Sequence, residues 1–139
     1  GVIKQGAESD ALVSNVDFAS TFLDAAGTGI PSDIQGRSLL PLLRGETPED
    51  WRKTHYYHYY QGGGHGVPLH FGVTDGRYKL IRFPDENLDT WEFFDLKTDP
   101  AELQSLYSNP EYEPKIKMMK GELDRLQKRL KVPGVSKSR

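Results

Sequence analysis

The sequence predicts an α+β fold: an antiparallel sheet of about four strands covered by a C-terminal helix. Leu69, Phe71 and Val73 alternate with small or polar residues, which is the period of a half-buried strand. Asp75-Gly76 follows and is a strong signal for a β-hairpin. A long amphipathic helix is predicted over about 111–131 by an apolar stripe with intervals of three and four residues: Ile116, Met119, Leu123, Leu126 and Leu130.

Four strands are expected, and they span residues 55–60, 70–74, 77–83 and 91–96. The first is the tyrosine-rich segment His55-Tyr-Tyr-His-Tyr-Tyr60, and aromatic residues are enriched in strands. Arg77 and Lys79 follow the hairpin signal, and ion pairs with Asp95 or Glu92 on the neighbouring strand are expected. An isolated helix of the predicted length is marginal in water, so its apolar stripe needs the sheet as a partner.

A shorter helix is expected near the start of the chain, over about 15–26. Ser14 and Asp17 have the spacing of a capping box, although Asp is second best to Glu there. Gly27 is well placed to end the helix in a left-handed conformation. A polar segment near Trp51 separates this part from the predicted sheet, and residues 134–139 are expected to be a frayed tail.

Composition excludes several function classes. The chain has 139 residues, with 18 Lys plus Arg and 20 Asp plus Glu, a formal charge of −2. That balance gives no electrostatic argument for binding nucleic acid or an anionic membrane surface. There are no cysteines, so disulfides, zinc-thiolate sites and cysteine nucleophiles are excluded. No apolar run approaches the length of a membrane span.

Five segments, in this order, resemble the C-terminal part of sulfatases, including arylsulfatases and sugar-sulfatases of the alkaline-phosphatase superfamily. They are Leu12 to Gly27, Gln35 to Gly45, Asp50-Trp-Arg-Lys53 with the tyrosine-rich strand, Gly76-Arg-Tyr-Lys-Leu-Ile81, and Trp91 to Glu102. The last is similar to the family's ELYDLxxDPxE element. Thr74 departs from the pattern, because similar sulfatases often carry Arg at this position.

The resemblance implies two parts of different origin. Residues 1–48 resemble the terminal segment of the large α/β sulfatase domain, and residues 49–133 resemble the C-terminal subdomain. The chain is therefore interpreted as a fragment whose partner is the missing N-terminal sulfatase domain. Phe18, Phe22 and Leu23 of the first helix are then expected to form an exposed apolar surface made to lie against that domain.

The resemblance also implies chemistry that this chain does not contain. Sulfatases use a formylglycine nucleophile made from Cys or Ser in a C/S-x-P-x-R motif, beside a calcium ion held by Asp and Asn. The chain has no Cys, and none of its serines lies in such a motif. We therefore expect no catalytic and no metal-binding residue in the chain, no sulfatase activity of the fragment alone, and calcium in the full-length enzyme. The family is usually exported, to the periplasm, the cell exterior or the lysosome.

Substrate-binding residues are predicted in the segment His65-Gly-Val-Pro-Leu-His70, which follows a run of glycines. It resembles a loop of sugar-sulfatases that borders the active-site cleft, and imidazoles can bond to sugar hydroxyls or to a sulfate oxygen. The alternative is a mobile loop with two solvated histidines. A metal site at His65 and His70 is disfavoured by the lack of a third ligand nearby.

Two functions remain open. The first is a fragment of a sulfatase that hydrolyses sulfate esters, with a sulfated sugar or glycosaminoglycan as substrate. The second is a non-catalytic module that binds carbohydrate or a protein partner. The segment from Leu12 to Gly45 favours the first, because an independent module has no use for a helix that belongs against another domain.

Overall fold

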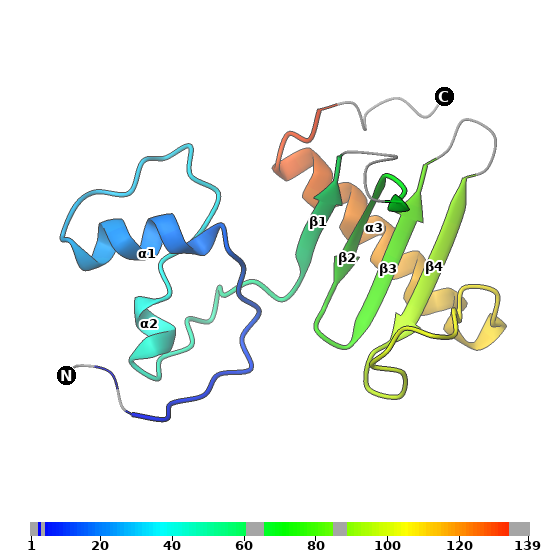
Figure 1. Cartoon of the computed structure of the whole chain (residues 1–139), viewed down its shortest axis with the longest axis horizontal. Coiled ribbons are helices and arrows are strands. Elements are labelled where there is room, and N and C mark those ends of the chain that lie inside the picture. Colours follow the sequence, from blue (N-terminus) through cyan, green and yellow to red (C-terminus); the bar gives the residue numbers. More distant parts are fainter. Residues whose placement is uncertain (1–2, 4, 61–65, 85–88, 134–139) are drawn as a thin grey trace. The chain divides into compact units, whose positions relative to one another are not determined.

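The computed structural model describes residues 3, 5–60, 66–84 and 89–133, and it has two compact units, Gly1–Lys53 and Thr54–Arg139. The first unit contains two helices, α1 (Asp17–Ala25) and α2 (Leu40–Leu43). The second contains a four-stranded sheet and a long helix packed on it (Figure 1). The predicted α+β class is confirmed.

The sheet is a simple antiparallel meander in the order β1-β2-β3-β4. Its strands are β1 (His55–Tyr59), β2 (His70–Thr74), β3 (Tyr78–Phe83) and β4 (Thr90–Asp95). The outer edge of β4 is partly covered by the chain that follows it. Leu106 donates its backbone N–H to the carbonyl of Phe93 at 2.7 Å, and Phe93 donates to Oγ of Ser105 at 3.2 Å. Such cover protects an edge from pairing with another chain.

Helix α3 (Glu113–Arg129) lies across one face of the sheet and follows a short 3-10 turn, η2 (Pro110–Tyr112) (Figure 1). Four residues of the predicted apolar stripe are buried, whereas Leu130 is half-buried at the C-cap. Burial of apolar surface between these two layers is the main stabilising contribution. The core consists of Phe71, Val73, Leu80 and Phe93 from the sheet and Ile116, Met119, Leu123 and Leu126 from α3.

The β2–β3 turn is centred one residue later than the Asp75-Gly76 pair suggests. Asp75 donates its backbone N–H to the carbonyl of Tyr78 at 3.1 Å, which makes Gly76 and Arg77 the two central residues. Gly76 has φ +90°, a conformation that glycine adopts without strain. Oδ1 of Asp75 accepts from the N–H groups of Arg77 and Tyr78, and Oδ2 accepts from Nζ of Lys115 on α3 at 2.7 Å. Asp75 therefore closes the turn and ties it to the helix.

Gly76→Val should destabilise the second unit by more than about 1 kcal/mol, because a β-branched residue is strained at this positive φ. The urea midpoint of the chain, followed by far-UV circular dichroism, measures the effect. Gly76→Asn is the matched control, since Asn tolerates positive φ better than a β-branched residue does. An unchanged midpoint for Gly76→Val would show that the turn does not need this conformation.

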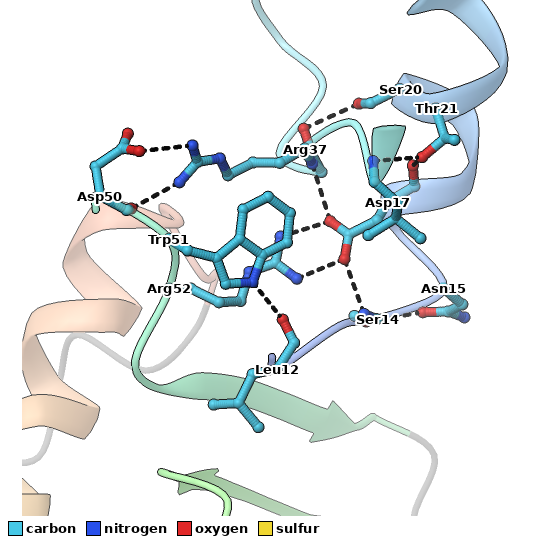
Figure 2. A network of polar contacts seen from close by, with 12 residues as sticks. Leu12, Ser14, Asn15, Asp17, Ser20, Thr21, Arg37, Asp50, Trp51 and Arg52 are labelled. Carbon is cyan, nitrogen blue, oxygen red and sulfur yellow. Dashed lines mark hydrogen bonds and ion pairs between the residues drawn. The ribbon is translucent and has the colours of Figure 1, made fainter. Parts of the chain in front are cut away.

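The first unit is organised around one buried carboxylate, Asp17, whose side chain is 0% exposed (Figure 2). Its two oxygens accept from both terminal nitrogens of Arg52 and from the backbone N–H groups of Ser14 and Arg37, at 2.8 and 2.9 Å. The bond from Ser14 is one half of the predicted capping box, but the other half is absent: α1 begins at Asp17, later than predicted, with Val16 as its N-cap, and the Ser14 hydroxyl bonds to Oδ1 of Asn15. One side chain thus joins the start of α1 to segments 20 and 35 residues away.

Neighbouring contacts tighten the same unit. Ser20 donates its hydroxyl to the carbonyl of Gly36 at 2.9 Å, and Trp51 donates Nε1–H to the carbonyl of Leu12 at 2.9 Å (Figure 2). Trp51 is 5% exposed, and the guanidinium of Arg52 lies 5.3 Å from its ring centroid. Trp51 is therefore the apolar centre of a unit whose other buried contacts are largely polar.

Helix α1 shows the reverse of ordinary amphipathic burial. Its buried residues are the polar Asp17 and Ser20, whereas Phe18 and Phe22 are 54% and 71% exposed. Gly27 ends the helix at φ +67°, with Thr28 donating to the carbonyl of Leu23, as in a Schellman motif. The apolar face of α1 is thus uncovered within the described part of the chain.

Candidate functional site

His70 lies on the face of the sheet opposite α3. Side chains of a strand alternate between faces, and the next residue, Phe71, belongs to the core beneath the helix. His70 is the first residue of β2 and pairs in register with Tyr59 of β1. Its side chain is half-buried. The strand register therefore places this imidazole on the side of the sheet away from α3.

Three aromatic rings surround the imidazole of His70. The ring of Tyr59 is stacked on it at 5.5 Å between centroids with 16° between planes. Tyr57 contacts it edge-on at 5.9 Å, and Phe83 of β3 lies 5.4 Å away at 36°. Contacts of this kind favour one orientation of the ring. His70 thus sits in an aromatic cluster drawn from three strands, which we call the His70 cluster (Tyr57, Tyr59, His70 and Phe83).

The backbone before β2 holds one nitrogen of His70. Nδ1 lies 2.9 Å from the carbonyl oxygen of Pro68. Because a carbonyl only accepts hydrogen bonds, Nδ1 carries the hydrogen in this contact. Among the described residues no group bonds to Nε2. The other predicted binding residue, His65, lies outside the described residues.

Tyr57 supports the cluster from the neighbouring strand by lying over Gly72. A Cβ added to Gly72 would come within 2.6 Å of the Tyr57 hydroxyl and 2.4 Å of the Leu80 carbonyl. Among the described residues this buried hydroxyl has no hydrogen-bond partner. Burial, and then the negative charges of Glu102 and Glu92, raise the pKa of Tyr57 well above its ordinary value. Tyr57 therefore remains a neutral phenol at physiological pH.

Two basic residues near the β2–β3 hairpin, Arg77 and Lys79, form ion pairs within the second unit. Arg77 donates to both oxygens of Asp95, at 3.1 and 2.8 Å, as expected. Lys79 does not pair with Asp95 or Glu92, because its ammonium reaches Glu102 in the loop after β4, at 2.7 and 2.8 Å. The ELYDLxxDPxE-like segment thus serves here to anchor a turn.

His58, in the tyrosine-rich strand β1, lies on the core side of the sheet, where it pairs in register with Phe71. Its ring stacks on Tyr60 at 3.7 Å between centroids, and its Nδ1 lies 2.8 Å from the Tyr56 hydroxyl. Burial, followed by the nearby charge of His70, lowers the pKa of His58. His58 is therefore a packing residue and a matched contrast to His70.

The described residues contain no group of three or more His, Asp or Glu side chains that could hold a metal ion. They therefore do not provide a calcium site of the kind that the sulfatase resemblance implies. An open pocket of about 470 Å³ lies between α3 and the segment before it, and none of the His70 cluster lines it. No helix in the described ranges is long and apolar enough to cross a membrane.

The family is decided by a match along almost the whole chain. Residues 1–129 match the family model described as "N-sulphoglucosamine sulphohydrolase, C-terminal". The chain belongs to this sulfatase family. The predicted relationship to the C-terminal domain of sulfatases, within the alkaline-phosphatase superfamily, is thus confirmed.

Individual sulfatases show the same relationship. The domain is 47% identical over 132 residues to an N-acetylglucosamine-6-O-sulfatase of Bacteroides thetaiotaomicron, covering 93% of this chain and 24% of the relative. It is 32% identical over 108 residues to arylsulfatase K of Rattus norvegicus, covering 75% of this chain and 19% of that relative. The sulfatase domain described here therefore spans about a quarter or less of these relatives.

Solved structures agree with the sequence relatives. A protein solved in complex with its substrate D-glucosamine-2-N,6-O-disulfate superposes with TM-score 0.91 and 44% identity, over 99% of this chain and 28% of that chain. A 2-O glycosaminoglycan sulfatase superposes with TM-score 0.81 and 27% identity, over 95% of this chain and 29% of that chain. The sulfatase domain thus has the fold of the corresponding part of sugar-sulfatases.

The aromatic residues around His70 were not predicted as part of the site. The sequence did contain a signal for them, because Tyr57 and Tyr59 alternate with Tyr56 and His58 in a segment predicted as a strand. What it lacked was the pairing of β1 with β2 and of β2 with β3, which brings Tyr59, His70 and Phe83 together.

Proposed function

We propose that this chain is the C-terminal domain of an enzyme that hydrolyses a sulfate ester on a glucosamine-type sugar or a glycosaminoglycan. The observation that carries the proposal is the likeness over 99% of the chain to a structure solved with D-glucosamine-2-N,6-O-disulfate. The nucleophile and the calcium ion of such an enzyme would come from residues outside this chain.

In this proposal His70 contacts the sugar. Its imidazole is on the face of the sheet away from α3, oriented by aromatic neighbours, with Nε2 bonded to no other described residue. Such a group provides a directed hydrogen bond at little cost in side-chain entropy, because its ring is already held. His65 is proposed as a second contact on the resemblance of its loop alone.

The exposed face of α1 is proposed to lie against the larger N-terminal part of the enzyme. Phe18 and Phe22 expose large apolar surfaces in the first unit, while polar residues of the same helix are buried. An apolar face of this kind in a domain that covers a quarter of its relatives is expected to be covered by the remaining part.

Replacing His70 by alanine in the full-length enzyme should lower kcat/KM for a sulfated sugar by about threefold to 150-fold, the range for loss of one neutral or charged hydrogen bond. A small aryl sulfate such as 4-nitrophenyl sulfate has no sugar hydroxyl, so its turnover should change little. Steady-state kinetics on both substrates measure the difference.

His58→Gln is the matched control, because it removes a histidine from the opposite side of the sheet and should leave both activities unchanged. Equal losses of His70→Ala on both substrates would place His70 in the sulfate pocket or show misfolding. Unchanged kinetics on the sugar would remove His70 from the substrate site.

The chain by itself should not hydrolyse sulfate esters, since a covalent step requires an activated nucleophile that its sequence does not provide. Purified chain with added calcium and an aryl sulfate should release sulfate at the rate of buffer. Turnover above that rate would place catalytic residues within these 139 residues.

A further inference from the structure

We infer that Nε2 of His70 accepts a hydrogen bond from the substrate. Its partner on the sugar is therefore a hydroxyl and not a sulfate oxygen. The inference rests on the proposed function and specifies the chemistry of one contact. It follows from the backbone contact at Nδ1, the aromatic cluster and the absence of another partner at Nε2 among the described residues.

The contact with Pro68 fixes which nitrogen of the neutral imidazole carries the hydrogen. Nδ1 is 2.9 Å from the Pro68 carbonyl, which can only accept. In the neutral ring the other nitrogen then has a free lone pair. Nε2 is therefore an acceptor, and it is the atom that the described structure leaves without a partner.

The aromatic neighbours fix the plane of the ring, and the bond to Pro68 fixes which edge carries Nδ1. Rotating the ring of His70 by half a turn would exchange its nitrogen and carbon edges and would break the bond to Pro68. The stacked ring of Tyr59 and the nearby ring of Phe83 hold the imidazole plane at 16° and 36° to their own planes. The lone pair of Nε2 thus has a defined direction, which is a condition for recognising one group among several.

An acceptor discriminates between the groups of a sulfated sugar. A hydroxyl can donate a hydrogen bond to a lone pair, whereas the oxygens of a sulfate ester only accept, so a neutral Nε2 next to sulfate would be repelled. Sites that bond to a substrate hydroxyl reject the analogue that lacks it, because the protein group is left unpaired. His70 is therefore assigned to a sugar hydroxyl as a specificity-determining residue.

The test uses the full-length enzyme with a 6-sulfated glucosamine and its analogues that each lack one hydroxyl. The wild-type enzyme should lose about two- to twelvefold in kcat/KM on one such analogue, the range of a neutral hydrogen bond. His70→Ala should lose a similar factor on the parent sugar and no longer distinguish that analogue from it. This coupling cannot arise from a merely structural defect, which would lower turnover of all analogues alike.

Two amide substitutions test the direction of the bond. In His70→Gln the side-chain amide reaches the position of Nε2 and can accept through Oε1, so part of the activity should be retained. In His70→Asn the amide reaches only the position of Nδ1, so turnover should be as low as in His70→Ala. Equal retention of activity by both variants would overturn the assignment of Nε2 as the accepting atom.

The remaining outcomes separate the inference from the proposed function. Coupling of His70→Ala to removal of a sulfate group, with no coupling to any hydroxyl, would make His70 a charged donor and overturn the inference alone. Equal loss on every sugar analogue would also overturn only the inference. No loss on any sugar sulfate would defeat the proposed role of His70 and the inference with it.

Discussion

Replacing Asp17 by asparagine should destabilise the first unit by about 3 kcal/mol or more, the scale for removing one partner of a buried ion pair. Asp17 is fully buried, and its two oxygens accept four hydrogen bonds, all from N–H donors of Ser14, Arg37 and Arg52. Asparagine keeps one acceptor oxygen and turns an NH₂ group toward donors. Arg52, whose side chain is only 15% exposed, would lose its counter-charge.

The effect can be measured in this unit alone, because the chain has two tryptophans and only Trp51 lies in the first unit. A Trp91→Phe background leaves Trp51 as the single fluorescent reporter, and its urea unfolding curve gives the change in stability. Asp24→Asn is the control, since Asp24 is an exposed aspartate on the same helix. Similar midpoints for the two variants would contradict the central role of Asp17.

The same carboxylate predicts how the first unit responds to acid. Burial alone would raise the pKa of Asp17, but the hydrogen bonds from Arg52 and from the N–H groups of Arg37 and Ser14 outweigh it, and the pKa lies below its ordinary value of 3.8. The unfolded chain therefore takes up the proton first. The contribution is present above about pH 4 and is lost as the pH falls through the folded-state pKa.

The second large effect is expected at Gly72 in the middle of β2. Gly72→Ala should destabilise the second unit by about 2 kcal/mol or more, because added atoms in a packed interior force shifts. The new Cβ would lie 2.4 Å from the Leu80 carbonyl oxygen and 2.6 Å from the Tyr57 hydroxyl. The first contact is with the backbone of a paired strand, which cannot move without disturbing the β2–β3 ladder.

The same substitution at Gly121 is a control with the opposite expected sign. Gly121 lies inside α3, where an added Cβ has no atom within 4 Å, so Gly121→Ala should stabilise by about 0.4–1 kcal/mol. Urea unfolding followed by circular dichroism compares the two. If the Gly72→Ala chain were as stable as the original, Tyr57 and β3 would be able to shift and accommodate the added Cβ with little loss of stability.

Much of the second unit could be predicted because its elements are specified by local patterns. The stripe from Ile116 to Leu126 has the helical period, and Phe71 and Val73 have the strand period. A period of two also shows which residues share a face, so the position of His70 away from the core follows from the sequence. The resemblance of ordered segments added the sulfatase family, which no local pattern could provide.

Contacts between distant residues were decided only by the tertiary structure. Asp17 was predicted as a helix cap, and its bonds to Arg52 depend on a chain path of 35 residues that no local pattern encodes. Lys79 reached Glu102 because the loop after β4 folds back toward β3. The Pro68 bond and the rings around His70 likewise depend on strand register and loop geometry. Sequence periodicity thus determined which residues face the core. Long-range packing decided which side chains meet, because the free energy of a contact between two side chains depends on their distance in space and not on their separation along the chain.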